Sequence, residues 1–156
     1  MKLLAYEVDK RSFLGVLNED ETWVYPISAA GMEYRSMKDL IREAGPSEME
    51  MLDYISKKAP GDVTGAAPVE EIRIVSPIPE PDQDIICLGI NYMDHAAESA
   101  RFQKEEFARP EKAIYFSKRV NRTNDPDGII PAHKNLTNQL DYEAELAVII
   151  KKDAKD

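Results

Sequence analysis

The stretch QLDYEAELAVII, from Gln139 to Ile150, combines a strand-like apolar run with two glutamates, Glu143 and Glu145. Side chains alternate along a strand, so positions two apart point to the same face. Every position from 146 to 150 is apolar, which is typical of a strand buried on both faces. We therefore expect a final strand here, with two carboxylates side by side near a buried end.

Two neighbouring carboxylates in such a strand repel each other, and removal from water raises the cost of their charge. A divalent cation relieves both problems, and oxygen ligands favour a hard ion such as Mg²⁺, Mn²⁺ or Ca²⁺. The alternative is a strand end in water with Glu143 and Glu145 both solvated. Taken alone, the common spacing E-x-E favours this alternative.

A second candidate pair lies upstream, in GINYMDHAAES, where His95 and Glu98 are three positions apart. The segment YMDHAAESARF predicts a short helix, on which such residues are neighbours on one face. A carboxylate beside an imidazole orients the ring and raises its basicity, as a general base that activates water requires. An ordinary surface pair is the alternative, and the spacing by itself favours it.

Single residues carry weaker signals. Cys87 lies within the apolar run IICLGI, which predicts a buried apolar filler and not a nucleophile. Lys118 follows a predicted strand, where it could meet an anionic substrate or be an ordinary strand-end charge. His133 lies in a polar loop, and we assign it no role.

Composition narrows the class of protein. The 156 residues carry a net charge of -9, which argues against non-specific binding to nucleic acid. One cysteine cannot form an internal disulfide, and no apolar h-region follows the N-terminus, so we expect a cytoplasmic protein. No apolar run approaches the roughly 18 residues that cross a bilayer, so we expect no membrane partner.

The first part of the chain predicts a small α+β domain over residues 1–68. Strands are indicated by KLLAYEV, SFLGVLN and TWVYPI, with a polar turn at residues 9–11. Two helices follow, with capping boxes at Ser36–Asp39 and Ser47–Glu50. GDVTGAAPVEE, residues 61–71, has the composition of a linker.

The second part, residues 69–156, consists mostly of short strands joined by loops. The predicted strands are IRIV, IICLGI, which should be buried, AIYFSK and the final stretch from Gln139. DPDG, residues 125–128, is a strong turn signal. Few helices are available to cover the sheet edges, which indicates part of a β-rich domain.

Four segments occur in an order that resembles the fumarylacetoacetate hydrolase family. They are ICLGINYMDHAAE, AIYFSK, GIIP and LDYEAELAVII, and they resemble the start of that family's catalytic domain over about residues 72–151. Residues 1–68 resemble the small N-terminal domain of many bacterial members. The resemblance implies an α+β fold, the family's β-rich roll, incomplete in this chain, and a homodimer at full length.

The resemblance also implies roles for the candidate residues. Glu143 and Glu145 match paired metal ligands for Mg²⁺ or Mn²⁺, with Ca²⁺ a possible substitute in crystals. His95 and Glu98 match a His–Glu dyad on a lid segment, and QKEEFARPEKA resembles the rest of that lid. Further candidate substrate-binding residues are Asn91, Tyr92 and Lys118.

The implied reaction is metal-dependent hydrolysis of a C–C bond in a small β-diketo or acylpyruvate-type acid. The metal would chelate the keto acid, and the dyad would activate a water. Isomerase, decarboxylase and lyase activities on related keto acids remain alternatives. The family's third metal ligand is an aspartate on a later strand, which Asp153 and Asp156 do not match. We therefore expect the N-terminal portion of a longer enzyme, or an inactive truncated fragment that acts only in binding or assembly.

Overall fold

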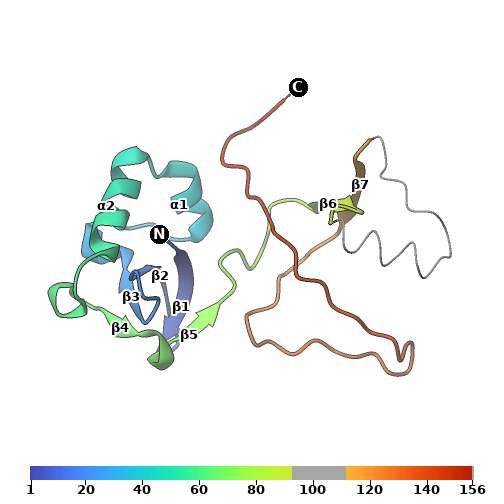
Figure 1. Cartoon of the computed structure of the whole chain (residues 1–156), viewed down its shortest axis with the longest axis horizontal. Coiled ribbons are helices and arrows are strands. Elements are labelled where there is room, and N and C mark those ends of the chain that lie inside the picture. The colour runs from blue at the N-terminus through green and yellow to red at the C-terminus, as the bar shows by residue number, and fades with distance from the viewer. Residues whose placement is uncertain (93–111, 156) are drawn as a thin grey trace. The chain divides into compact units, whose positions relative to one another are not determined.

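The computed structural model describes residues 1–92 and 112–155 (Figure 1). The residues group into two compact units. The first unit comprises residues 1–79 together with 124–156, and the second comprises residues 80–123. Among the described residues, no helix is both long and apolar enough to cross a membrane.

An antiparallel five-stranded sheet forms the centre of the first unit. Its strands, in the spatial order β4-β3-β2-β1-β5, are β1 (Leu3–Val8), β2 (Arg11–Leu17), β3 (Trp23–Pro26), β4 (Ala67–Pro68) and β5 (Arg73–Val75). The predicted strands in residues 1–27 and 72–75 are confirmed. The linker prediction for residues 61–71 is partly wrong, because the backbone at residues 67–68 pairs with β3 and continues the sheet.

The first hairpin shows how local sequence determines register. Val8 pairs with Arg11, so that Asp9 and Lys10 form a two-residue loop. Both have positive φ, 50° and 65°, as a type I′ turn requires. This turn matches the twist of the strands and confirms the turn predicted at residues 9–11.

Two helices follow the first three strands, α1 (Met37–Glu43) and α2 (Pro46–Ser56). The Ser36 hydroxyl oxygen accepts a hydrogen bond from the backbone N–H of Asp39 at 3.1 Å, which confirms the first predicted cap. The second predicted cap is wrong, because α2 begins with Pro46 at its first turn and not after Ser47. Proline suits this position because its missing N–H would have no partner there.

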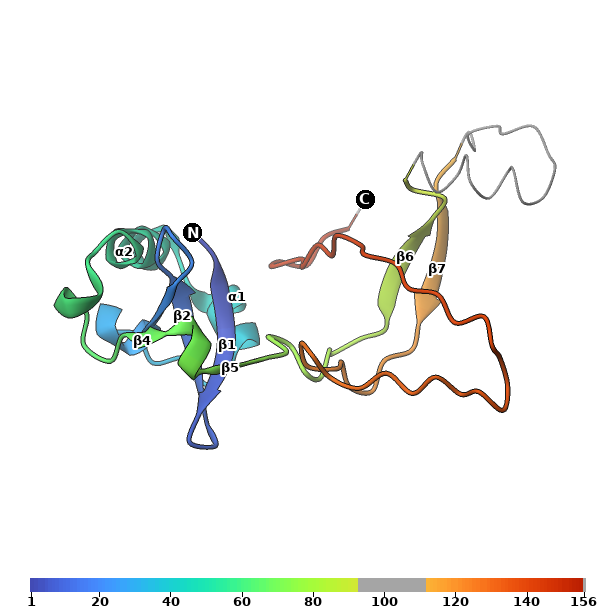
Figure 2. The same ribbon diagram turned by 60° about the horizontal axis from the view of Figure 1, so that its bottom comes forward.

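The apolar side chains of the sheet alternate between two faces, and α1 and α2 cover one of them (Figures 1 and 2). Val16, Tyr25, Leu40 and Leu52 belong to the larger core cluster on the helix side. The opposite face carries a smaller cluster of Leu4, Tyr6 and Val24. Three short 3₁₀ segments lie between these elements: η1 (Ile27–Ala30) after β3, η2 (Pro60–Asp62) after α2, and η3 (Val69–Glu71) between β4 and β5.

The second unit contains a two-stranded antiparallel ribbon of β6 (Ile85–Gly89) and β7 (Ile114–Lys118) (Figure 2). Both strands were expected from the sequence and are confirmed. The prediction that residues 85–90 are buried is wrong except at Cys87, since Ile86 is 67% exposed. A ribbon of two strands has no second layer to cover its faces.

The prediction of a final strand at residues 139–150 is also wrong for the described structure. Residues 139–150 carry no regular secondary structure and are exposed, with Leu146 at 84%. A strand forms only where its backbone groups pair with a neighbouring strand, and among the described residues none pairs with this stretch.

The fold class is therefore mixed α and β with antiparallel sheets, as expected. The boundary between residues 68 and 69 stays a prediction. The helix expected at residues 92–102 lies outside the described residues except at its first position, and most of the lid segment lies outside them as well.

Candidate functional site

The glutamates of the candidate metal site lie in the extended segment that follows the 125–128 turn. Glu143 and Glu145 are both exposed. Directly before them, the backbone N–H of Tyr142 donates to the Asp141 carboxylate at 2.8 Å. The two glutamates offer carboxylate oxygens, which are the donors that hard divalent cations prefer.

Two glutamates are fewer ligands than a hard divalent cation needs. Within residues 1–92 and 112–155, no group of three or more His, Cys, Asp or Glu side chains could hold a metal ion. Two carboxylates fit Mg²⁺ or Mn²⁺ in donor type, but they do not complete an octahedral site. Glu143 and Glu145 can therefore supply part of a site.

The candidate catalytic pair, His95 and Glu98, lies outside the described residues. The chain enters that segment at the end of β6, where Ile90 has a φ of 53°. A positive φ is rare for a β-branched residue, and it marks a tight turn in the backbone. This turn directly precedes Asn91 and Tyr92, two of the candidate substrate-binding residues.

The third candidate substrate-binding residue lies at the other end of the ribbon. Gly89, two positions before Asn91, pairs with Ile114, whereas Lys118 pairs with Ile85. The two ends, Ile85 and Gly89, are four positions apart along β6, which corresponds to about 13 Å. The structure therefore does not bring Lys118 together with Asn91 and Tyr92.

Two side chains of the ribbon have identifiable surroundings. The Lys118 ammonium lies 5.9 Å from the centre of the Phe116 ring, at the outer limit of a cation–π contact. Cys87 is a buried free cysteine, as the filler interpretation requires.

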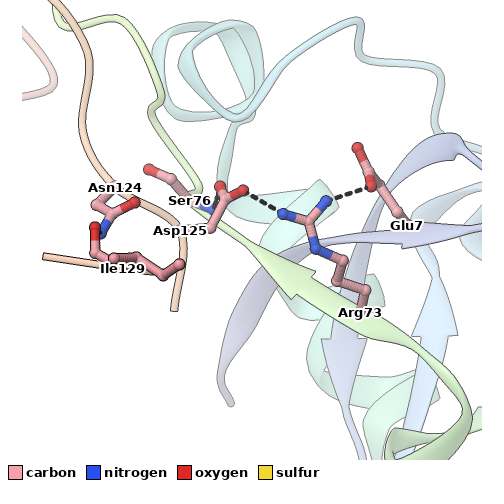
Figure 3. A network of polar contacts seen from close by, with 6 residues as sticks. All are labelled: Glu7, Arg73, Ser76, Asn124, Asp125 and Ile129. Carbon is pink, nitrogen blue, oxygen red and sulfur yellow. Dashed lines mark hydrogen bonds and ion pairs between the residues drawn. The ribbon is translucent and has the colours of Figure 1, made fainter. Parts of the chain in front are cut away.

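Sequence patterns missed one polar cluster. Arg73 lies between two carboxylates, those of Glu7 and Asp125, at 2.8 and 2.6 Å (Figure 3). These partners are 66 and 52 positions away in the chain, so no local spacing could indicate them. Only the turn signal at residues 125–128 identified part of this cluster.

Comparison with known proteins gives a family match and several relatives. Residues 84–156 match the family model described as "Fumarylacetoacetate (FAA) hydrolase C-terminal". The chain is 39% identical to "Oxaloacetate tautomerase YisK" of Bacillus subtilis (strain 168), covering 97% of this chain and 52% of that protein. It is 28% identical to "Uncharacterized protein SERP0556" of Staphylococcus epidermidis and 27% identical to "Uncharacterized protein SAUSA300_0871" of Staphylococcus aureus, with the same coverage. The chain thus spans about half the length of the curated relatives it matches.

Proposed function

The chain belongs to the fumarylacetoacetate hydrolase family, and we propose that it contributes to a metal-dependent enzyme that acts on small keto acids. Members of this family are enzymes that commonly use divalent metals. The 39% identity to an oxaloacetate tautomerase, along 97% of the chain, carries the proposal. We further propose the family's β-rich roll, with a homodimer as its assembly.

Glu143 and Glu145 are the proposed metal ligands of this chain. Their donor atoms suit Mg²⁺ or Mn²⁺, and both side chains are exposed and accessible. A bound divalent ion would supply Lewis-acid stabilisation of the negative charge that develops on keto-acid oxygens. Further ligands are required, because the two carboxylates leave most octahedral positions to other groups.

Keto–enol tautomerisation is the reaction that the similarity to the oxaloacetate tautomerase of Bacillus subtilis favours. A proton leaves the carbon between two carbonyl groups, and a proton arrives on a carbonyl oxygen, with no carbon–carbon bond broken. His95 would take and return such a proton, with Glu98 orienting the imidazole. Asn91 and Tyr92 are proposed to contact the substrate, and Lys118 is a weaker candidate because of its place at the far end of the ribbon.

Hydrolysis of an acylpyruvate-type acid is the second candidate, and the matched family model favours it. This reaction consumes one water, breaks one carbon–carbon bond and releases two acids. The proposed dyad would then activate the water. Decarboxylation and lyase cleavage are further alternatives, and a role in binding or assembly alone is the non-enzymatic one.

Product analysis separates these reactions. The protein with Mg²⁺ is incubated with oxaloacetate and with acetylpyruvate, while NMR follows the keto and enol forms and the products. Faster exchange between the two forms of oxaloacetate, with no loss of carbon, is the expected result. Release of acetate from acetylpyruvate would favour hydrolysis, and release of CO₂ from oxaloacetate would favour decarboxylation. If neither compound reacts faster than in buffer with Mg²⁺ alone, the enzymatic proposal for this chain is wrong.

A further inference from the structure

We propose that Arg73 and Asp125 fasten the turn at residues 125–128 to the small sheet, and that this contact positions the segment that carries Glu143 and Glu145. Arg73 belongs to β5, at the edge of the sheet, and Asp125 begins the turn. The two are positioning residues. Their link to the metal ligands rests on the function proposed above.

The fastening contact uses both oxygens of one carboxylate. Asp125 Oδ2 accepts a hydrogen bond from Arg73 Nη2 at 2.6 Å, and its Oδ1 accepts one from the backbone N–H of Ser76 at 2.9 Å. The other end of the guanidinium, Nη1, reaches Glu7 on β1 at 2.8 Å (Figure 3). One arginine therefore joins two strands of the sheet to the turn.

The turn itself is shaped to present this carboxylate. The backbone N–H of Gly128 donates to the Asp125 carbonyl at 3.0 Å and closes the turn. Pro126 in the second position and the φ of 61° at Asp127 in the third are features of a type II turn. Asn124 adds a hydrogen bond from its side-chain amide to the carbonyl of Ile129 at 3.3 Å.

The surroundings make this contact stronger than an ordinary surface ion pair. An isolated exposed pair contributes little to stability, and the Arg73 side chain is 61% exposed. However, the Asp125 and Glu7 side chains are only 24% and 30% exposed. A guanidinium between two such carboxylates forms a network, and the bond to the Ser76 backbone adds a geometric constraint that salt cannot screen.

A second contact ties the same segment to the helices. The Lys151 ammonium donates to the carbonyl of Ala44, the C-cap residue that follows α1. A lysine at this position also interacts favourably with the helix dipole. Glu143 and Glu145 therefore lie between two attachments to residues 1–79, at positions 125 and 151. Loosening the stronger attachment should release the segment between them.

Amide hydrogen exchange of the full chain tests the fastening directly, with Asp125→Ala and Arg73→Met as the altered proteins. The Ser76 amide should exchange at least about tenfold faster in Asp125→Ala, because its acceptor is removed. Arg73→Lys keeps the charge but loses the planar guanidinium fork whose two ends reach the two carboxylates, so its exchange rate should fall between those of Arg73→Met and the unchanged protein. Arg122→Met is the matched control, since Arg122 forms an exposed pair with Glu80 at 3.6 Å. Unchanged exchange at Ser76 in Asp125→Ala would overturn the fastening.

Backbone ¹⁵N relaxation tests the positioning without any metal. The heteronuclear NOE of the amides at residues 141–145 should fall in Asp125→Ala and Arg73→Met and stay unchanged in Arg122→Met. Unchanged values in both altered proteins, with faster exchange at Ser76, would mean that the contact is structural only, and the positioning role would be wrong.

Mn²⁺ uptake, followed by the EPR signal of the free ion, separates this inference from the proposed function. Weaker uptake in Asp125→Ala than in Arg122→Met, at equal thermal stability, is the expected result. If the unchanged protein takes up no Mn²⁺, the proposed metal site of this chain is wrong, while the exchange and relaxation results still decide the fastening and the positioning.

Discussion

The hydroxyl of Tyr25 donates a hydrogen bond to the backbone carbonyl of Lys58 at 2.8 Å, across 33 positions of sequence. Tyr25 lies on β3 and is fully buried, and Lys58 follows the end of α2. The bond therefore joins the sheet to the segment directly after the helix that covers it. A carbonyl that packs against a buried side chain needs such a donor, because it is shielded from water.

Tyr25→Phe should lower the free energy of unfolding by about 1–2 kcal/mol, because it leaves the Lys58 carbonyl without this donor. Urea unfolding followed by circular dichroism measures the change. Tyr54→Phe is the control: Tyr54 is 58% exposed and should change stability by less than about 0.5 kcal/mol. Equal effects of the two substitutions would contradict the structural role of the buried hydroxyl.

Stability should also fall in alkali, and Tyr25 should account for part of the loss. Burial, followed by the nearby charges of Asp20 and Asp62, raises the pKa of Tyr25. A raised pKa in the folded state gives stability that is fully present below the unfolded pKa of about 10 and is lost as pH rises through the folded pKa. Unfolding measured at about pH 8 and about pH 11 should therefore show a smaller loss for Tyr25→Phe than for the unchanged protein. A parallel loss in both proteins would assign the alkaline effect to other groups.

Gly15→Ala should destabilise the sheet by about 1–3 kcal/mol through overpacking. A Cβ at Gly15 would lie 2.5 Å from Val24 Cγ2 and 2.9 Å from Tyr6 Cε1, both in the smaller core cluster. Thermal unfolding should show a lower midpoint. Gly61→Ala is the control, because a Cβ there meets no atom within 4 Å. A midpoint that falls as much for Gly61→Ala would contradict the steric explanation.

Glu143→Gln and Glu145→Gln should each weaken Mg²⁺ or Mn²⁺ binding by at least about tenfold. Loss of a residue that only hydrogen-bonds a metal ligand already weakens metal binding about tenfold, and loss of a ligand itself should cost at least as much. Titration calorimetry on the full chain gives the affinities. Glu50→Gln is the control, because it makes the same change of charge at an exposed position of α2, outside the candidate site. Equal binding by all four proteins would exclude Glu143 and Glu145 as ligands.

Local sequence determined most of the regular structure of residues 1–79. Short segments rich in apolar residues predicted the strands, and the polar turn at residues 9–11 predicted the first hairpin. Ser36 predicted the start of α1. These features depend on neighbouring residues alone, because side-chain alternation, turn conformation and helix capping each act within a few positions.

Local sequence patterns gave wrong predictions at residues 139–150 and at the start of α2. An apolar run predicted a buried strand, but a strand also needs a neighbour for its backbone, and burial needs a second layer. For α2, the predicted cap was Ser47, but the helix begins one residue earlier, at Pro46.

For the candidate site too, some features could be read from the sequence and others only from the tertiary structure. Sequence alone indicated Glu143 and Glu145 as candidate metal ligands, because donor type can be read from a residue's identity, and that role stays a prediction. Only the tertiary structure showed that Lys118 lies away from Asn91 and that Arg73 joins Glu7 to Asp125. Pairings across dozens of positions depend on strand register and on how the chain returns to the sheet, and no short sequence pattern contains that information.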